Sequence, residues 1–247
     1  TWFAGNGAVL NFAVTLYSQA MVKTRAKPGV SIIVEEESRE VLDLPAGEKP
    51  LYDGKYDLLK AAVKSMEIDK VDVHVHTDVP AGCGTGAPAA TSVALLGALA
   101  YLADRHYTPH EVASLAHELE TSELGIESGT QDQTAAAVGG IGFHLIEPYP
   151  RVSSSPVKLR HEVVWELQSR LLLVYTGKRH LSSDVHKKVI SDYQAGNPSA
   201  VKAIETLRET PRLALSALYR GDLDAFAESM NRNNEAQKAL HAEASNS

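Results

Sequence analysis

Apolar and polar residues alternate in several short stretches of the first half of the chain, a spacing that is typical of half-buried β-strands. From this spacing we expect strands over 8–16, 19–26, 30–35, 40–44, 71–76 and 141–146. Other stretches have apolar residues at helical spacing or an apolar, alanine-rich composition. These predict helices over 56–66, 91–102, 108–122 and 130–138. Thr108 followed by Glu111 is a capping box, which marks the start of the third helix.

The second half of the chain is mostly helical in its pattern. Helices are expected over 182–194, 198–219 and 223–242. Pro211 should kink the second of them, and the apolar run 171–175 predicts a buried strand. Three prolines and three consecutive serines in 148–156 favour a linker there.

Composition and charge exclude several classes of protein. The chain has 247 residues, of which 44% are hydrophobic and 22% charged, as in an ordinary soluble globular protein. Its net charge of −7 argues against a nucleic-acid partner, and no apolar run is long enough to predict a membrane span. The single cysteine, Cys83, excludes an internal disulfide and is consistent with a reducing cytoplasm. We therefore expect a cytoplasmic protein without a membrane or nucleic-acid partner, and we leave a homodimer open.

A glycine-rich loop lies between the strand over 71–76 and the helix over 91–102. Gly82, Gly84 and Gly86 occupy every second position, so the backbone can approach a ligand closely. A helix that begins directly afterwards presents unpaired N–H groups and the positive end of its dipole, which is typical of a phosphate site. The loop matches neither the Walker pattern nor a dinucleotide fingerprint. A tight turn before a buried helix is the alternative that the spacing leaves open.

Two acidic residues flank a short turn between predicted helices. Glu120 lies at the end of one helix and Asp132 at the start of the next, so their side chains can converge. Asp132 stands between Gln131 and Gln133, which is unusual for a surface acid. Spacing alone nevertheless favours solvated charges at helix ends, with Asp132 stabilising the dipole of its helix.

Taken together, these motifs resemble the GHMP kinase superfamily. The resemblance rests on the glycine loop, on Leu119-Glu120-Thr121, on Gly129-Thr130-Gln131-Asp132-Gln133 and on the segment from Leu171 to Lys178. It is closest to the sugar branch of fucokinases and D-glycero-D-manno-heptose 7-phosphate kinases, and it covers essentially the whole chain. It implies that further family segments precede Thr1 and follow Ser247.

The resemblance implies an α+β fold of two domains. Residues 1–156 would form a ribosomal-protein-S5-domain-2-like, ATP-binding N-terminal domain that lacks its first strand. Residues 157–247 would form an incomplete ferredoxin-like C-terminal domain.

The resemblance also implies an activity, the transfer of the γ-phosphate of ATP to a hydroxyl of a sugar or sugar phosphate. Heptose 7-phosphate, fucose and galactose are the types of acceptor. Asp132 would be the catalytic acid or base, and Glu120 a Mg²⁺ ligand. The expected ATP-binding residues are Pro80, Gly82, Cys83, Gly84, Thr85, Gly86 and Ala87. The expected sugar-binding residues are Gln131, Gln133, Tyr175, Thr176 and Gly177.

The loop departs from the family pattern at Thr85, Ala87 and Pro88, where the family has Leu and two hydroxyl residues. One of those hydroxyls normally helps to hold Mg²⁺, so we assign Thr85 as its replacement. The departure also supports an alternative, a catalytically weak or inactive nucleotide-binding relative with a regulatory role. A decarboxylase of the mevalonate diphosphate type shares the fold, but its motifs are less similar.

Overall fold

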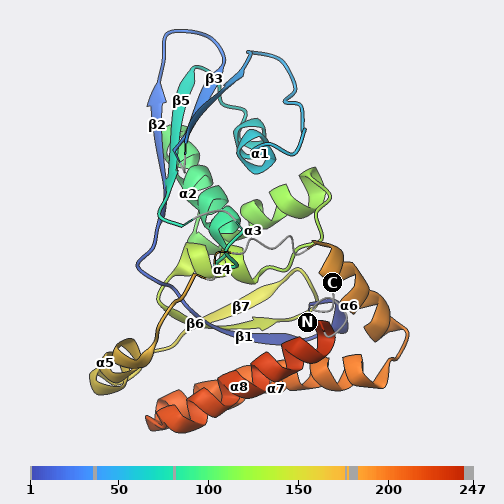
Figure 1. Cartoon of the computed structure of the whole chain (residues 1–247). Coiled ribbons are helices and arrows are strands. Elements are labelled where there is room, and N and C mark those ends of the chain that lie inside the picture. The colour runs from blue at the N-terminus through green and yellow to red at the C-terminus, as the bar shows by residue number, and fades with distance from the viewer. Residues whose placement is uncertain (1, 36–37, 80–81, 176, 178–182, 242–247) are drawn as a thin grey trace. The chain divides into compact units, whose positions relative to one another are not determined.

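The computed structural model describes residues 2–35, 38–79, 82–175, 177 and 183–241 (Figure 1). It mixes sheets and helices, which confirms the predicted α+β class. Contacts divide the chain into two compact units. One comprises 13–139 and 177–180, and the other comprises 1–12, 140–176 and 181–247. The predicted domain boundary between residues 156 and 157 stays a prediction.

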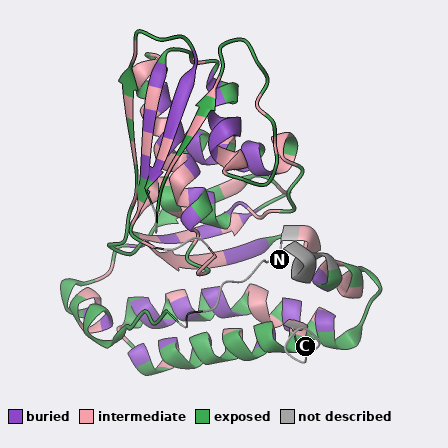
Figure 2. Ribbon diagram, turned by 45° about the horizontal axis from the view of Figure 1, so that its top comes forward, coloured by how far each residue is buried: buried purple, intermediate pink, exposed green. Residues whose placement is uncertain are grey.

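The unit built from 13–139 contains a four-stranded sheet with the order β2-β5-β3-β4. Its strands are β2 (Ser18–Thr24), β3 (Val30–Glu35), β4 (Arg39–Leu44) and β5 (Val71–Thr77). β5 runs antiparallel to β2 and parallel to β3. Along β5, buried valines alternate with more exposed residues, including His74 and His76, as the alternating pattern predicts. Figure 2 shows buried and less buried positions alternating along the strands of this sheet. The period of two therefore sets which face of the strand is buried.

Helices complete the core of this unit. They are α1 (Asp57–Met66), α2 (Ala87–Leu102), α3 (Pro109–Glu118), the π-helical turn η2 (Leu119–Glu123) and α4 (Gln131–Val138). Of these, α2 packs against β2 and β5 of the sheet. Ile32 and Val73 of the sheet and Leu95 and Leu99 of α2 are fully buried in one cluster. The predicted capping box is confirmed, because Thr108 Oγ1 accepts from the N–H of Glu111, whose carboxylate accepts from the N–H of Thr108.

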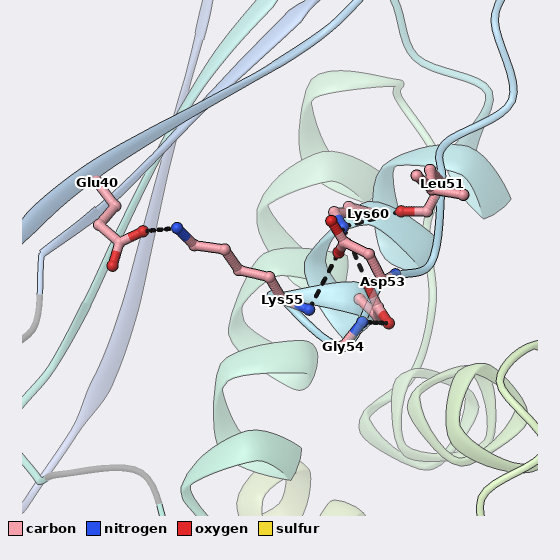
Figure 3. A network of polar contacts seen from close by, with 7 residues as sticks. Glu40, Leu51, Asp53, Gly54, Lys55 and Lys60 are labelled. Atoms are coloured by element: carbon pink, nitrogen blue, oxygen red, sulfur yellow. Dashed lines mark hydrogen bonds and ion pairs between the residues drawn. The ribbon is translucent and has the colours of Figure 1, made fainter.

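A buried lysine fixes the loop that leads into α1 (Figure 3). Lys60 Nζ donates to Leu51 O at 2.9 Å, to Asp53 Oδ1 at 2.5 Å and to Asp57 Oδ1 at 2.9 Å. Only 6% of its side chain is exposed. The neighbouring ion pair of Lys55 with Glu40 lies further out, with the lysine side chain 58% exposed. The two pairs therefore differ in burial although both join lysine to a carboxylate.

The second unit contains a three-stranded antiparallel sheet with the order β1-β6-β7. Its strands are β1 (Gly7–Phe12), β6 (Ile141–Ile146) and β7 (Val152–Pro156). The linker expected over 148–156 is therefore wrong, because its second half is a strand. Ser154 Oγ lies 2.8 Å from Nδ1 of His144 on β6, and an edge strand tolerates Pro156 because no ladder partner needs its missing N–H.

Within its described residues, the same unit contains four helices and a short 3₁₀ turn, η1 (Trp2–Ala4). The helices are α5 (His161–Arg170), α6 (Ser183–Gln194), α7 (Pro198–Arg220) and α8 (Leu223–His241). The sequence pattern predicts three of them and misses α5. Asn197 caps α7 by accepting from two backbone N–H groups, and α7 runs through Pro211. Phe12 of β1 and Phe226 of α8 pack edge to face with centroids 5.9 Å apart.

The buried strand expected over Leu171–Tyr175 is wrong. These residues lie outside every strand of the described part of the chain, and all five are exposed, Leu172 by 89%. An apolar run predicts that burial is favourable, but it does not supply a neighbouring strand with a free edge. Among the described residues, no helix is both long and apolar enough to cross a membrane.

Candidate active site

The glycine loop connects the end of β5 to the first turn of α2. Gly82, Gly84 and Gly86 all have positive φ, at 83°, 74° and 71°. Gly86 is the N-cap of α2 and provides no side chain to cap it. The first N–H groups of α2 therefore lack a side-chain cap, which suits an anionic ligand. Pro80, predicted to bind ATP, lies outside the described residues.

The tip of the loop carries the two side chains predicted to contact the nucleotide or its metal. Thr85 is exposed, and its Oγ1 lies 3.2 Å from Sγ of Cys83. Cys83 is a free thiol. Ala87 is buried as the first residue of α2. A hydroxyl is thus present at the tip, next to the backbone of the loop.

Asp132 lies against the last glycine of this loop. A Cβ added to Gly86 would stand 3.3 Å from both Cβ and Cγ of Asp132 and 3.5 Å from its Oδ2. Asp132 is an exposed residue in the first turn of α4. The structure therefore brings the predicted catalytic acid and the predicted phosphate loop together. Gln131, which precedes Asp132, is also exposed.

Glu120 is buried in the π-helical turn η2, with 8% of its surface exposed. Its Oε1 accepts from Gln133 Nε2 at 2.7 Å, and the same amide nitrogen lies 3.4 Å from Ser128 Oγ. Gln133 is 1% exposed. Glu120 is thus tied to the residue that follows Asp132. The expected contact of Gln133 with a sugar stays a prediction.

Two side-chain polar atoms at the start of α4 are buried without a hydrogen-bond partner in the described part of the chain. They are Thr130 Oγ1 and Gln133 Oε1, one helical turn apart at the start of α4. Buried polar atoms are nearly always hydrogen-bonded in folded proteins. The start of α4 therefore retains hydrogen-bonding capacity that the described residues do not use.

The remaining predicted sugar-binding residues lie after the apolar run. Tyr175 is 52% exposed, and Gly177 has a positive φ of 75°. Thr176 lies outside the described residues. Their role in binding a sugar stays a prediction.

Sequence reasoning missed three residues that hold the end of η2. The hydroxyl of Tyr52 donates to Glu123 Oε1 at 2.5 Å, and Lys64 Nζ forms an ion pair with the same oxygen. Lys64 above all, and then Tyr52, lowers the pKa of the Glu123 carboxyl. Burial, followed by the hydrogen bond to Glu123, raises the pKa of Tyr52. Tyr52 and Lys64 are 71 and 59 positions away from Glu123, so no local pattern indicates these contacts.

Known proteins resemble this chain over most of its length. Residues 56–140 match the family model of the GHMP kinases N terminal domain. A D-glycero-alpha-D-manno-heptose 7-phosphate kinase from Campylobacter jejuni is 27% identical over 97% of this chain and 72% of its own length. A bifunctional fucokinase/GDP-fucose pyrophosphorylase from Arabidopsis thaliana is 26% identical over 91% of this chain, which spans only 23% of that protein.

Solved structures share the fold. A D-glycero-D-manno-heptose 1-phosphate kinase from B. thetaiotaomicron aligns with a TM-score of 0.78 at 22% identity, over 94% of this chain and 71% of its own. A Lactococcus lactis galactokinase complexed with galactose aligns with a TM-score of 0.68 at 18% identity, over 96% and 71%. These alignments show that the chain has the fold of these kinases.

Proposed function

We propose that this chain transfers the γ-phosphate of ATP to a hydroxyl of a sugar or sugar phosphate. The premise is that residues 56–140 match the GHMP kinases N-terminal domain. The observation that carries the proposal is the contact between Asp132 and Gly86. It sets a carboxylate beside the backbone loop that would hold the phosphates. Phosphoryl transfer needs this combination, because it depends on positioning and charge stabilisation more than on covalent chemistry from the protein.

Each part of the site has a distinct role in this proposal. The uncapped start of α2 and the loop backbone bind the phosphates of ATP. Asp132 accepts a hydrogen bond from the acceptor hydroxyl, orients it and takes its proton as the new bond forms. Gln131, beside Asp132 in the sequence and exposed, offers its amide to the sugar. Sugar binding by Tyr175, Thr176 and Gly177 stays a prediction.

The donor set near Asp132 fits Mg²⁺. Glu120 offers a carboxylate oxygen and Thr85 a hydroxyl, and hard cations prefer such oxygen ligands. Within the described residues, no group of three or more His, Cys, Asp or Glu could hold a metal ion. Mg²⁺ is usually bound by one or two carboxylates together with substrate phosphates, so in this proposal Glu120 is its protein carboxylate. When bound, the ion would neutralise charge on the transferred phosphate.

The acceptor class is proposed from the relatives and from the polar residues near Asp132. Two of the relatives are named as heptose phosphate kinases, one as a fucokinase and one as a galactokinase. A site that pairs each hydroxyl of a polyol rejects analogues lacking one. We therefore propose a free or phosphorylated hexose or heptose as acceptor and the cytoplasm as the location.

The test is a phosphorylation screen with ATP and Mg²⁺. The acceptors are fucose, galactose, sedoheptulose 7-phosphate, D-glycero-D-manno-heptose 7-phosphate, mevalonate and homoserine. We expect a sugar to be the best acceptor. Preference for mevalonate or homoserine over every sugar would contradict the proposed acceptor class. ATP binding without turnover of any acceptor would favour the regulatory relative instead.

The variant Asp132→Asn tests the catalytic role of Asp132. We expect its turnover with the best sugar to fall by about 10²-fold or more, because a positioned base typically contributes 10²- to 10⁴-fold. Binding of an ATP analogue, measured by calorimetry, should change little. Asp104→Asn is the control, because the Asp104 side chain is 97% exposed. Equal turnover in both variants would make Asp132 a structural residue.

A further inference from the structure

The π-helical turn η2 interrupts the helical path between α3 and the segment that leads to Asp132. Its wide hydrogen bond runs from the N–H of Leu124 to the carbonyl of Leu119 at 3.1 Å. The N–H of Ile126 then donates to the carbonyl of Glu120 at 2.8 Å. Single π-turns are rare and occur frequently at functional sites. Here the turn carries Glu120, so its geometry sets the position of that carboxylate.

Carboxylates near both ends of η2 are held by residues from other elements. Glu120 accepts from Gln133 of α4. Glu123 accepts from Tyr52, in the loop before α1, and pairs with Lys64 of α1. Lys64 Nζ also lies 5.7 Å from the centroid of the Tyr52 ring. We call Tyr52, Lys64 and Glu123 the Glu123 anchor.

The anchor is more than an ordinary surface ion pair. A single exposed pair is worth little, because solvent screens it and two long side chains must be ordered. In the anchor, one carboxylate oxygen receives a phenol and an ammonium together, and charge-assisted hydrogen bonds are roughly twice as strong as neutral ones. Glu123 and Lys64 keep only 31% and 39% of their side chains exposed. The lowered pKa of Glu123 agrees with an anchor that favours the charged carboxylate.

We propose that Tyr52 and Lys64 are positioning residues, which hold the π-turn 119–123 through Glu123 and thereby hold the Glu120 carboxylate. The effect on Mg²⁺ use rests on the proposed function, in which Glu120 is a Mg²⁺ ligand. The effect on the conformation of the turn itself does not depend on that function. Loss of the anchor should loosen the hydrogen bonds of Leu124 and Ile126, which close the turn.

The first experiment is amide hydrogen exchange of the whole chain, followed at Leu124 and Ile126. In Tyr52→Phe we expect both amides to exchange about fivefold faster or more, since losing a hydrogen bond to a charged group lowers the free energy of local opening. Tyr101→Phe is the control, because Tyr101 is 87% exposed. Lys64→Met should give the same increase and Lys64→Arg should restore protection. Unchanged exchange in Tyr52→Phe and Lys64→Met would overturn the proposal.

A double-mutant cycle tests whether the three side chains act as a unit. In a Glu123→Gln background, Tyr52→Phe should add little further exchange, because coupled residues are not additive. Full additivity of the two substitutions would show that Tyr52 acts independently of Glu123. That result would also overturn the proposal that Tyr52 holds the turn through Glu123.

The second experiment measures the Mg²⁺ concentration for half-maximal rate. We expect it to rise about threefold or more in Tyr52→Phe relative to Tyr101→Phe, because outer contacts that orient a metal ligand typically affect metal affinity. Faster amide exchange with unchanged Mg²⁺ dependence would contradict the claim that the Glu123 anchor positions the Glu120 carboxylate for Mg²⁺. A wild-type chain that phosphorylates no acceptor would contradict the proposed function, while the exchange experiment would still decide the anchor.

Discussion

At the scale of single residues, substitutions at Gly84 and Gly86 distinguish the effect of backbone strain from the effect of crowding Asp132. Both have positive φ, at 74° and 71°, so Ala is strained at either position. A Cβ at Gly84 would meet nothing within 4 Å, whereas a Cβ at Gly86 would press on Asp132. The turnover of Gly86→Ala should therefore be about tenfold or more lower than that of Gly84→Ala, since a small misplacement of a catalytic group greatly slows the reaction. Melting temperatures of the two variants should be similar, and equal turnover would show that the contact does not matter.

How far the site could be predicted differs from residue to residue. The helix starts at which Gly86 and Asp132 lie could be predicted, because a local motif marks each of them, while the roles of these residues stay predictions. The burial of Gln133 could not, because a polar residue in a polar segment gives no sign of being 1% exposed. The contacts of Tyr52 and Lys64 with Glu123 could not be predicted either. Their partner Glu123 is 59 or more positions away in the sequence, and one sequence without a fold contains no record of such a contact.

At the scale of elements, the start of α1 depends on the buried ammonium of Lys60. Lys60→Met removes the ammonium that donates to Asp53, Asp57 and the Leu51 carbonyl, while backbone N–H groups still donate to both carboxylates. We expect the free energy of unfolding to fall by about 1–3 kcal/mol, because the variant loses hydrogen bonds between charged groups. Lys55→Met removes a more exposed pair with Glu40 and should leave stability unchanged within error. Denaturant unfolding of both variants provides the comparison, and equal losses would mean that burial of Lys60 contributes nothing.

The end of α5 and the apolar run after it provide a second comparison of two leucines. Leu167 is 4% exposed and Leu172 is 89% exposed. Leu167→Ala should cost about 2–5 kcal/mol of stability, as buried leucines do. Leu172→Ala should cost almost nothing in the same unfolding measurement. If Leu172→Ala were as damaging as Leu167→Ala, the run 171–175 would be the buried strand that its sequence predicts.

The elements that could be predicted are those with a clear period or a clear cap. Val30–Glu35 and Ile141–Ile146 are strands with the predicted bounds, because alternation indicates both the state and the face. Helix α5 was missed because its N-cap residue, Arg160, makes no capping hydrogen bond with its side chain, and because the helix buries only Val163 and Leu167. Strand β7 was missed because serine and proline normally indicate a loop, and only its pairing with β6 makes it a strand.

At the scale of the whole molecule, nucleotide binding should stabilise the chain against heat. A ligand at a hundred times its dissociation constant adds ~2.7 kcal/mol to the free energy of unfolding, so an ATP analogue with Mg²⁺ should raise the melting temperature. Gly84→Val should lose this increase, because a side chain there blocks the approach of phosphates.

Gly47→Val is the matched control for that measurement. Gly47 has a φ of 76° and, like Gly84, nothing within 4 Å of an added Cβ. The backbone cost of the two substitutions is therefore comparable, but Gly47 lies outside the phosphate loop. Gly47→Val should keep the full increase in melting temperature. A similar increase in Gly84→Val would show that the loop is only a turn.

The path of the chain through its two sheets could not be predicted from local patterns. The first strand, β1, pairs with β6, so that Gly7 faces Ile146 across the ladder. Periodicity indicates that both segments are strands, yet it contains no information on which strands pair across more than a hundred residues. The same holds for β5, which comes last in its sheet by sequence and lies between β2 and β3.

The β1–β6 ladder also has a consequence for how such a chain can evolve. Phe12, the last residue of β1, is the cross-strand partner of Ile141, the first residue of β6. The segment 13–139 thus departs from one end of a ladder and returns to the same end. A segment with adjacent ends can be inserted, lost or exchanged between genes without disturbing the strands that flank it. Since 13–139 includes the glycine loop, Glu120 and Asp132, recombination at two positions would transfer all three together.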